Sequence, residues 1–302
     1  MVERRPGVMP PKPGPPPRQV PRRRIVRRRL GAVGAVVLVG LVVLALVKIT
    51  GGSSKPAPPP VVAAPKPFRI VFPEGFTRLD MAQRVEAVAK IARAKRHKPV
   101  HISKRTYLAA SGPRVVPGFG SKKRNLEGFL FPATYEFLAG TRSSQLVHDQ
   151  LAAFRKNWSR VDLSYARKKN LTPYDVLIIA SMIEGETIAP DERPLVAAVI
   201  YNRLHAKMTL GIDATIRYGL HVPGTEALKQ SQLDSSNPYN TRKFPGLPPT
   251  PIGNPGLASI QAAAHPAKVG YLYFVRKPDR VHHYFTKSFQ DFVNHEIAYG
   301  YK

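Results

Sequence analysis

Two glutamates end an almost wholly apolar stretch, Ile178–Thr187, which reads Ile-Ile-Ala-Ser-Met-Ile-Glu-Gly-Glu-Thr. Burying an ionised carboxylate is costly, so a fold that directs carboxylates into apolar surroundings usually uses them. Burial also raises the pKa of a carboxyl group, which then keeps its proton closer to neutral pH. Such a group can act as a general acid and protonate a leaving group. Glu184 and Glu186 are therefore the first candidates for chemistry.

Helical geometry separates these two glutamates, because residues two apart lie about 200° apart around an ideal helix. Glu186 shares its face with bulky apolar residues, whereas the neighbours of Glu184 are smaller. The bulky residues are Ile179, Met182 and Ile183, and the smaller ones are Ala180 and Ser181. Bulky neighbours and the negative helix C-terminus should both raise the pKa of Glu186. We expect Glu186 to be the acid and Glu184 a supporting or alternative acid; otherwise both are exposed at a fraying helix end.

Three residues predict where the helix that carries the glutamates begins. Thr172 can cap it, Pro173 suits its first position, and Asp175 can complete a capping box. Apolar periodicity predicts the other elements. The expected helices are 77–94, 103–110, 143–158, 161–169, 191–204 and 260–264. The expected strands are 68–72, one within 126–137, 271–275 and 283–285. This mixture predicts the α+β class.

Residues 205–256 are dense in Pro, Gly and Asn and are predicted to be mostly loop. Long loops in a compact domain are usually functional. Four of their polar residues are therefore candidates for contact with a substrate: Asp213, Tyr239, Asn240 and Thr241. Each could instead be ordinary turn chemistry, and Asp213 could be a second carboxylate. The aromatic segment 126–137 is expected to be a loop and short strand that face a cleft, with Phe129, Phe131 and Tyr135 as core or cleft wall.

No cofactor or metal is expected. The chain has no cysteine, which excludes disulfides, thiolate metal sites and thiol catalysis. His282 and His283 are adjacent, and neighbouring residues of a strand point to opposite faces. A metal site shared by these two histidines is therefore not predicted.

The N-terminal region predicts a membrane anchor. Leu30–Val47 has no charged or polar side chain, and eighteen helical residues span about 27 Å. Two arginine triplets precede it, at 22–24 and 27–29, and only Lys48 follows closely. The positive-inside rule then places the N-terminus in the cytoplasm and the rest of the chain outside. The competing interpretation is a cleaved signal peptide, but no small-residue cleavage site follows Ala45.

Composition divides the remaining chain. The net charge of +28 favours anionic partners, but membrane orientation already explains the arginine triplets, so nucleic acid is not expected as a partner. We expect a disordered basic tail (1–29), a membrane anchor (30–49) and a Pro-rich linker (50–67). A small β-α unit (68–118) and a larger region that carries the glutamates (119–302) follow.

At this point the sequence resembles the endolytic murein transglycosylases, also called YceG-like proteins. Their motifs recur in order over about 160 residues, from Leu126 to Phe285. The longest matches are 126–135 (Leu-Glu-Gly-Phe-Leu-Phe-Pro-Ala-Thr-Tyr), 180–187 (Ala-Ser-Met-Ile-Glu-Gly-Glu-Thr) and 196–204 (Val-Ala-Ala-Val-Ile-Tyr-Asn-Arg-Leu). Shorter matches lie at 213–218, 239–241, 246–249, 254–256, 262–266 and 272–275.

The resemblance implies a membrane-anchored lytic transglycosylase of the bacterial cell membrane with its catalytic domain outside. Such an enzyme cuts the MurNAc–GlcNAc β-1,4 bond of nascent peptidoglycan strands and leaves 1,6-anhydro-MurNAc ends. It also implies that Glu186 is the catalytic glutamate, that the β-α unit corresponds to part of a LysM-like region, and that cell-wall synthases are possible partners. A non-catalytic peptidoglycan-binding or divisome scaffold and a hydrolytic muramidase assisted by Asp213 are the alternatives.

The sequence departs from the family pattern at two places. Where the family has Gln-x-Asp-Pro-Thr, this chain has Gly211-Ile-Asp-Ala-Thr215, so Ala214 replaces the proline. Where a Glu-His pair follows the His-x-Phe motif, this chain has Asp291-Phe292. Both differences concern the expected rim of the cleft and not the acid itself.

Overall fold

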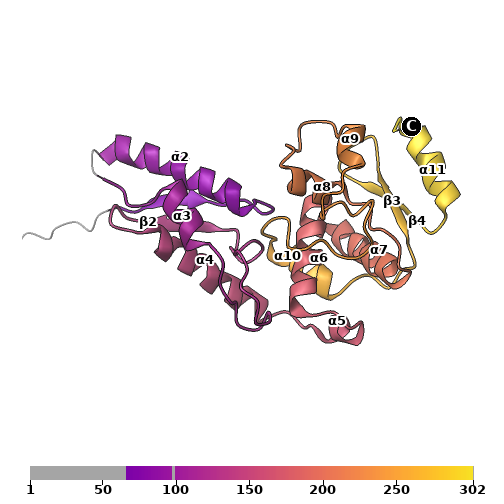
Figure 1. The fold of residues 1–302 in the computed structure, drawn as a ribbon, viewed down its shortest axis with the longest axis horizontal. Helices are drawn as coiled ribbons and strands as arrows, with labels where there is room; N and C mark the ends of the chain where they lie inside the picture. The colour runs from indigo at the N-terminus through magenta and orange to yellow at the C-terminus, as the bar shows by residue number, and fades with distance from the viewer. Residues whose placement is uncertain (1–65, 97–98, 302) are drawn as a thin grey trace, which may run out of the picture. The chain divides into compact units, whose positions relative to one another are not determined.

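The computed structural model describes residues 66–96 and 99–301 (Figure 1). The chain divides between Ala63 and Ala64, so the described residues belong to the second of two compact units. The expected tail (1–29), membrane anchor (30–49) and most of the linker (50–67) lie outside the described residues. Among residues 66–96 and 99–301, no helix combines the length and the apolar character that crossing a bilayer requires.

The first elements of this unit form a small α+β layer. The strands β1 (Phe68–Val71) and β2 (Thr134–Phe137) pair antiparallel. Helices α2 (Arg78–Arg96), α3 (Lys104–Ala110) and α4 (Ser143–Trp158) pack with them. Because β2 pairs with β1, the expected boundary between residues 118 and 119 falls inside this layer and not between two units.

The segment 126–137 belongs to the same layer, and of the two alternatives for its aromatic side chains, core or cleft wall, Phe129 takes the core. Phe129 is fully buried and contacts Phe119, Phe154 and Tyr174 by its ring. A glycine is required just before it: Gly128 has a φ of +85°, and a Cβ there would lie 2.7 Å from Pro251. The aromatic side chains therefore build core.

Helix α6 (Pro173–Glu186) is the central helix of the remaining fold (Figure 1). Its predicted start is confirmed: the Thr172 hydroxyl accepts the Asp175 N–H, and the Asp175 carboxylate accepts the Thr172 N–H. Residues 176–183 are all buried, so the helix is apolar on every face and needs neighbours all round. Helices α7 (Arg193–His205), α8 (Asp213–Leu220) and α10 (Leu257–Ala264) supply them.

The segment 205–256 contains two helices that the sequence did not predict, α8 and the short α9 (Gln230–Leu233). The first is short and has no side-chain cap at its N-terminus, so the usual start signal is missing. Two further short helices lie elsewhere, α5 (Ser164–Lys168) and the 3₁₀ turn η1 (Pro190–Glu192). The predicted loop is thus partly helical.

The C-terminal elements form a hairpin with a helix against it. The strands β3 (Tyr273–Arg276) and β4 (His283–Thr286) pair antiparallel, as expected for this region. Helix α11 (Phe289–Ala298) packs on both strands and has no buried residue. The sequence did not predict α11. With two small sheets and mostly helical packing, the α+β class is confirmed.

A buried carboxylate joins the first layer to the helices around α6. Glu127 accepts the backbone N–H of Arg78 at 2.9 Å and the side-chain amide of Asn254 at 2.9 Å. Its other oxygen accepts the Tyr218 hydroxyl of α8 at 3.1 Å. Burial raises the pKa of Glu127 to about 7, although these donors oppose the shift.

Candidate active site

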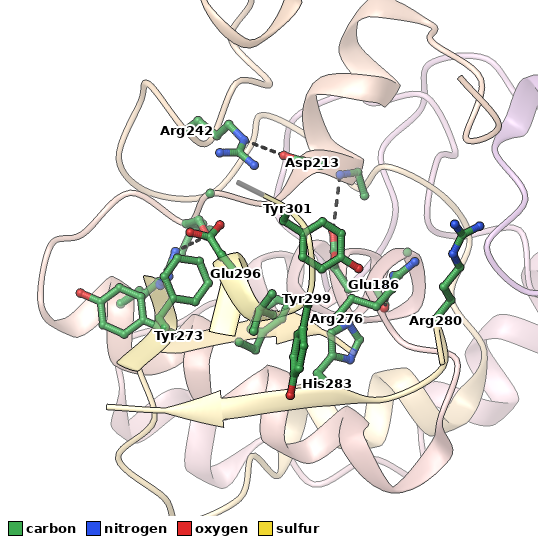
Figure 2. A pocket seen from close by; sticks show the side chains of 18 of the residues that line it. Glu186, Asp213, Arg242, Tyr273, Arg276, Arg280, His283, Glu296, Tyr299 and Tyr301 are labelled. Atoms are coloured by element: carbon green, nitrogen blue, oxygen red, sulfur yellow. Dashed lines mark hydrogen bonds and ion pairs between the residues drawn. The ribbon is translucent and has the colours of Figure 1, made fainter. Parts of the chain in front are cut away.

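A cavity of about 1160 Å³ opens where α6 ends (Figure 2). Its lining comes from the end of α6, the start of α8, the β3–β4 hairpin and helix α11. Glu186 lies in this lining, whereas Glu184 does not. The two glutamates therefore have separate surroundings, as the helical geometry predicted.

Glu186 has the electrostatic surroundings of a proton donor. Burial is the main effect that raises its pKa, and the nearby Asp213 carboxylate raises it further. Arg276 and a long hydrogen bond of 3.5 Å from the Ala214 N–H partly oppose this shift. The net direction is upward, so Glu186 keeps its proton at a higher pH than an ordinary glutamate. This agrees with the expectation from the sequence.

Glu184 is a structural residue on the other side of the helix. Its side chain is only 7% exposed, and its carboxylate accepts the Gly256 N–H at 2.9 Å at the start of α10. The guanidinium of Arg193 lies 3.8 Å away. Negative charge at a helix N-terminus is favourable, so Glu184 helps hold α10 against α6. The alternative of two exposed glutamates at a frayed helix end is excluded by this packing.

Gly185 lies between the two glutamates and lets α8 approach. A Cβ at this position would lie 3.2 Å from the Cβ of Ala214, which is closer than side chains normally pack. The glycine also lines the cavity. It therefore brings the first turn of α8, with Asp213 and Ala214, next to Glu186.

Of the four loop candidates, only Asp213 lines the cavity. Its carboxylate accepts from the Nε of Arg242 at 2.6 Å. The amide of the buried Asn240 donates to the backbone oxygens of Leu233 and Ser235, and its oxygen accepts the Arg242 N–H.

The other two loop candidates are likewise occupied within the protein. Thr241 is buried and pairs by its hydroxyl with Thr215, while the Tyr239 hydroxyl pairs with Thr250. Through these bonds Tyr239, Asn240 and Thr241 hold the segment that presents Arg242 and Asp213, and their contact with substrate stays a prediction.

The sequence reasoning missed most of the cavity wall. Arg276 ends β3 and donates to the backbone oxygen of Glu186 at 3.1 Å. Aromatic residues of β3 and of the C-terminal segment face the same space. They are Tyr273, Phe274, Phe289, Phe292, Tyr299 and Tyr301. The motif at 272–275 pointed to the strand, but nothing in the sequence pattern showed that α11 closes the cavity.

The two adjacent histidines contact different carboxylates. His283 is buried in the wall, its Nδ1 lies 2.6 Å from Glu192, and burial lowers its pKa. His282 is about half exposed and lies 2.9 Å from Asp279, which raises its pKa. Within the described ranges, no three His, Asp or Glu side chains lie close enough together to hold a metal ion.

These features define an α+β protein with one desolvated carboxyl group in a large cavity that has aromatic and cationic walls. Such a site suits acid–base chemistry on an elongated polar substrate. The YceG-like family model matches residues 54–296, and the chain belongs to that family.

Known relatives agree with this assignment. An endolytic murein transglycosylase of Bacillus subtilis (strain 168) is 38% identical over 157 residues, which cover 51% of this chain and 43% of the relative. The enzyme of that name from Streptococcus pneumoniae (strain R6) is 32% identical over 258 residues, which cover 80% of this chain and 45% of the relative. The chain thus spans less than half the length of these relatives. A crystal structure of a YceG-like protein from Listeria monocytogenes superposes with a TM-score of 0.62 and 29% identity, covering 76% of each chain.

Proposed function

We propose that this protein is a peptidoglycan lytic transglycosylase in which Glu186 is the catalytic acid and base. The observation that carries the proposal is the position of Glu186: it is the one carboxyl group with a raised pKa among the described residues that line the cavity. The names of the relatives from B. subtilis and S. pneumoniae support murein as the substrate.

The reaction needs only this one carboxyl group. Protonated Glu186 gives its proton to the oxygen of the β-1,4 bond, and the bond between that oxygen and C1 of MurNAc breaks. The 6-hydroxyl of the same MurNAc then attacks C1 and loses its proton to the Glu186 carboxylate. The product is a 1,6-anhydro-MurNAc end, and Glu186 is protonated again for the next cycle. The partial positive charge that develops on the sugar is stabilised by the carboxylate.

Hydrolysis is the second candidate, because Asp213 supplies another carboxylate in the same cavity. Many glycosidases use two carboxyl groups, one as the acid and one to activate water or to form a covalent intermediate. In this structure Asp213 is bound to Arg242 at 2.6 Å, which competes with a role as base. Lytic transglycosylation therefore remains the preferred reaction.

Digestion of purified peptidoglycan strands by the full chain in mild detergent separates the candidates. Mass spectrometry of the new ends should show anhydro products, whereas hydrolysis would give ends that are heavier by one water molecule. A scaffold without activity would leave the strands intact. Glu186→Gln should lower the rate by about 10²–10⁴-fold. Retained activity in Glu186→Gln, together with loss in a folded Glu184→Gln, would move the acid to Glu184.

The surroundings of this activity are part of the same proposal. The apolar run Leu30–Val47 with its preceding arginines supports a single-pass anchor in the bacterial cell membrane, with the N-terminus in the cytoplasm and the catalytic domain outside. The segment 68–118, which starts at β1, would be the LysM-like part. Cell-wall synthases would be neighbours of the enzyme. Protease protection in sealed membrane vesicles tests the orientation, because only the segment before the anchor should be protected from outside in right-side-out vesicles.

A further inference from the structure

Five arginines line the cavity, and three of them are already bound by groups of the protein. Arg242 pairs with Asp213. Arg203 donates to the backbone oxygens of residues 210 and 272, and Arg217 to those of residues 223 and 226. These contacts tie the three side chains to the walls of the cavity.

Arg276 and Arg280 make fewer contacts: among the described residues the Arg276 side chain makes one hydrogen bond, to the backbone oxygen of Glu186, and no hydrogen bond or ion pair of the Arg280 side chain is found. One amino group of Arg276 donates to the backbone oxygen of Glu186, and Arg276 is itself one of the residues that line the cavity. Figure 2 draws Arg280 on the same side as Arg276, away from Arg242 and Tyr273. Both cations therefore line the same cavity as Glu186, and Arg276 is bonded to the backbone of the acid.

The turn between β3 and β4 holds Arg280 in this place. The Asp279 carboxylate accepts the backbone N–H groups of Val281 and His282 and contacts the His282 ring. The Asp279 carboxylate thus bonds to residues of its own turn, and it forms no ion pair with the adjacent Arg280. Arg280 itself has a φ of +58°, and its N–H donates to the Lys277 oxygen, so the tip is a closed turn.

We propose that Arg276 and Arg280 form a subsite for a carboxylate carried by the glycan strand next to the bond that is cut. Guanidinium groups present forked donors that match a carboxylate, and two of them lining one cavity can bind the same anion together. This inference rests on the proposed function, because a murein strand is the ligand in question.

The position of Arg276 determines which carboxylate this is. Because Arg276 contacts the Glu186 backbone, the bound anion must lie close to the cleaved bond. Every MurNAc carries a lactyl ether, so a carboxyl group accompanies each cleavable bond along the strand. It is either the free lactyl carboxylate, in a strand without peptides, or a carboxylate of the attached peptide stem.

Binding of defined strands to the full chain tests the subsite. The Glu186→Gln background prevents cleavage, so that a Kd can be measured by fluorescence anisotropy with end-labelled strands. Three ligands are compared: strands without peptides, strands with peptides, and peptide-free strands whose lactyl carboxyls are converted to methylamides. Arg280→Gln is the main variant, because its side chain makes no hydrogen bond or ion pair with residues 66–96 and 99–301, and Arg276→Lys and Arg276→Gln complement it. Lys277→Gln is the matched control, since it removes a charge from the same turn without lining the cavity.

The subsite predicts a selective loss. Arg280→Gln should raise the Kd for carboxylate-bearing strands about tenfold and leave the Kd for the methylamide unchanged, while Lys277→Gln changes neither. Arg276→Lys should lose less affinity than Arg276→Gln. The source of the carboxylate follows from whether the loss occurs with the peptide-free or the peptide-bearing strand.

Two results would overturn the subsite. In one, Arg280→Gln has no effect on any strand. In the other, Arg280→Gln raises the Kd for the methylamide strands as much as the Kd for the carboxylate-bearing strands. That result would mean that the arginines bind sugar or peptide groups. Cleavage by the enzyme with Glu186 intact is measured separately. If that enzyme produces no cuts, the proposed function fails; if it cuts strands while the Kd values ignore charge, only the subsite fails.

Discussion

Replacing Glu127 by Gln should make the protein more stable at alkaline pH. Glu127 is only 6% exposed and connects Arg78 of the first layer with Asn254 and with Tyr218 of α8. A glutamine can keep this network, because its oxygen can accept from Arg78 and Asn254 while its amide donates to the Tyr218 hydroxyl. The variant therefore imitates the protonated acid but cannot ionise.

The size of the effect follows from the raised pKa. The difference between a pKa of about 7 in the fold and 4.5 for an ordinary glutamate corresponds to about 3 kcal/mol. Since the folded state binds the proton more tightly than the unfolded state, the free energy of unfolding falls as pH rises from about 4.5 to 7. Above this range the loss is complete. The glutamine variant escapes it, so its advantage should grow by about 2 to 3 kcal/mol between pH 5 and pH 8.

Urea unfolding at several pH values measures this difference. The fluorescence of the single tryptophan, Trp158, reports on the core, because its ring packs on Phe119 and Phe154. Glu136→Gln is the control, since the Glu136 side chain is 53% exposed and, within the described part of the chain, forms an ion pair with an exposed arginine alone. Its difference from the wild type should stay within about 0.5 kcal/mol at every pH. Equal pH dependence of the wild type and Glu127→Gln would refute the argument from burial.

Three further predictions concern the acid and its neighbours. Asp213→Asn removes a charge that raises the pKa of Glu186, so the alkaline limb of the kcat/KM profile should move to lower pH. Ala214→Pro removes a hydrogen bond that lowers this pKa, so the same limb should move to higher pH; a shift in the reverse direction in either variant would contradict the electrostatic account. Glu184→Gln should lower the free energy of unfolding by about 1 kcal/mol, because Arg193 loses the carboxylate 3.8 Å away while the repulsion between Glu184 and Glu74 is also removed, whereas Glu186→Gln should not destabilise the fold. Thermal unfolding of the two variants side by side distinguishes these roles.

The part of the site that the sequence could predict lies on one helix. Thr172 and Asp175 mark the start of α6 by local chemistry, and the apolar run after them requires burial on all sides. The angle between Glu184 and Glu186 then follows from helical geometry alone. These inferences need no knowledge of distant contacts, and the structure agrees with each of them.

The remaining parts depend on contacts between distant segments. Helix α8 has no capping side chain, so the local signal for its start is missing. Helix α11 has one, because Ser288 accepts the Asp291 N–H, but this helix buries none of its residues, so its packing has no apolar pattern to predict it. Arg276 reaches Glu186 across ninety positions of sequence. Tyr239 and Thr241 have the residue types of a sugar-binding loop, yet their hydroxyl groups bond inside the protein. A residue type shows what a side chain can do, whereas its partners depend on the tertiary fold.

The surroundings of Glu186 illustrate this difference most clearly. The sequence attributes the raised pKa of Glu186 to bulky neighbours and to the helix C-terminus, both on α6. In the structure, the first turn of α8 also acts on this pKa from outside the helix. Asp213 raises the pKa and the Ala214 N–H lowers it, and Gly185 allows both to come close. A proline at position 214 would have no N–H to donate, whereas Ala214 gives the acid one long hydrogen bond. The proton affinity of Glu186 therefore depends on α8 as well as on the helix that carries it.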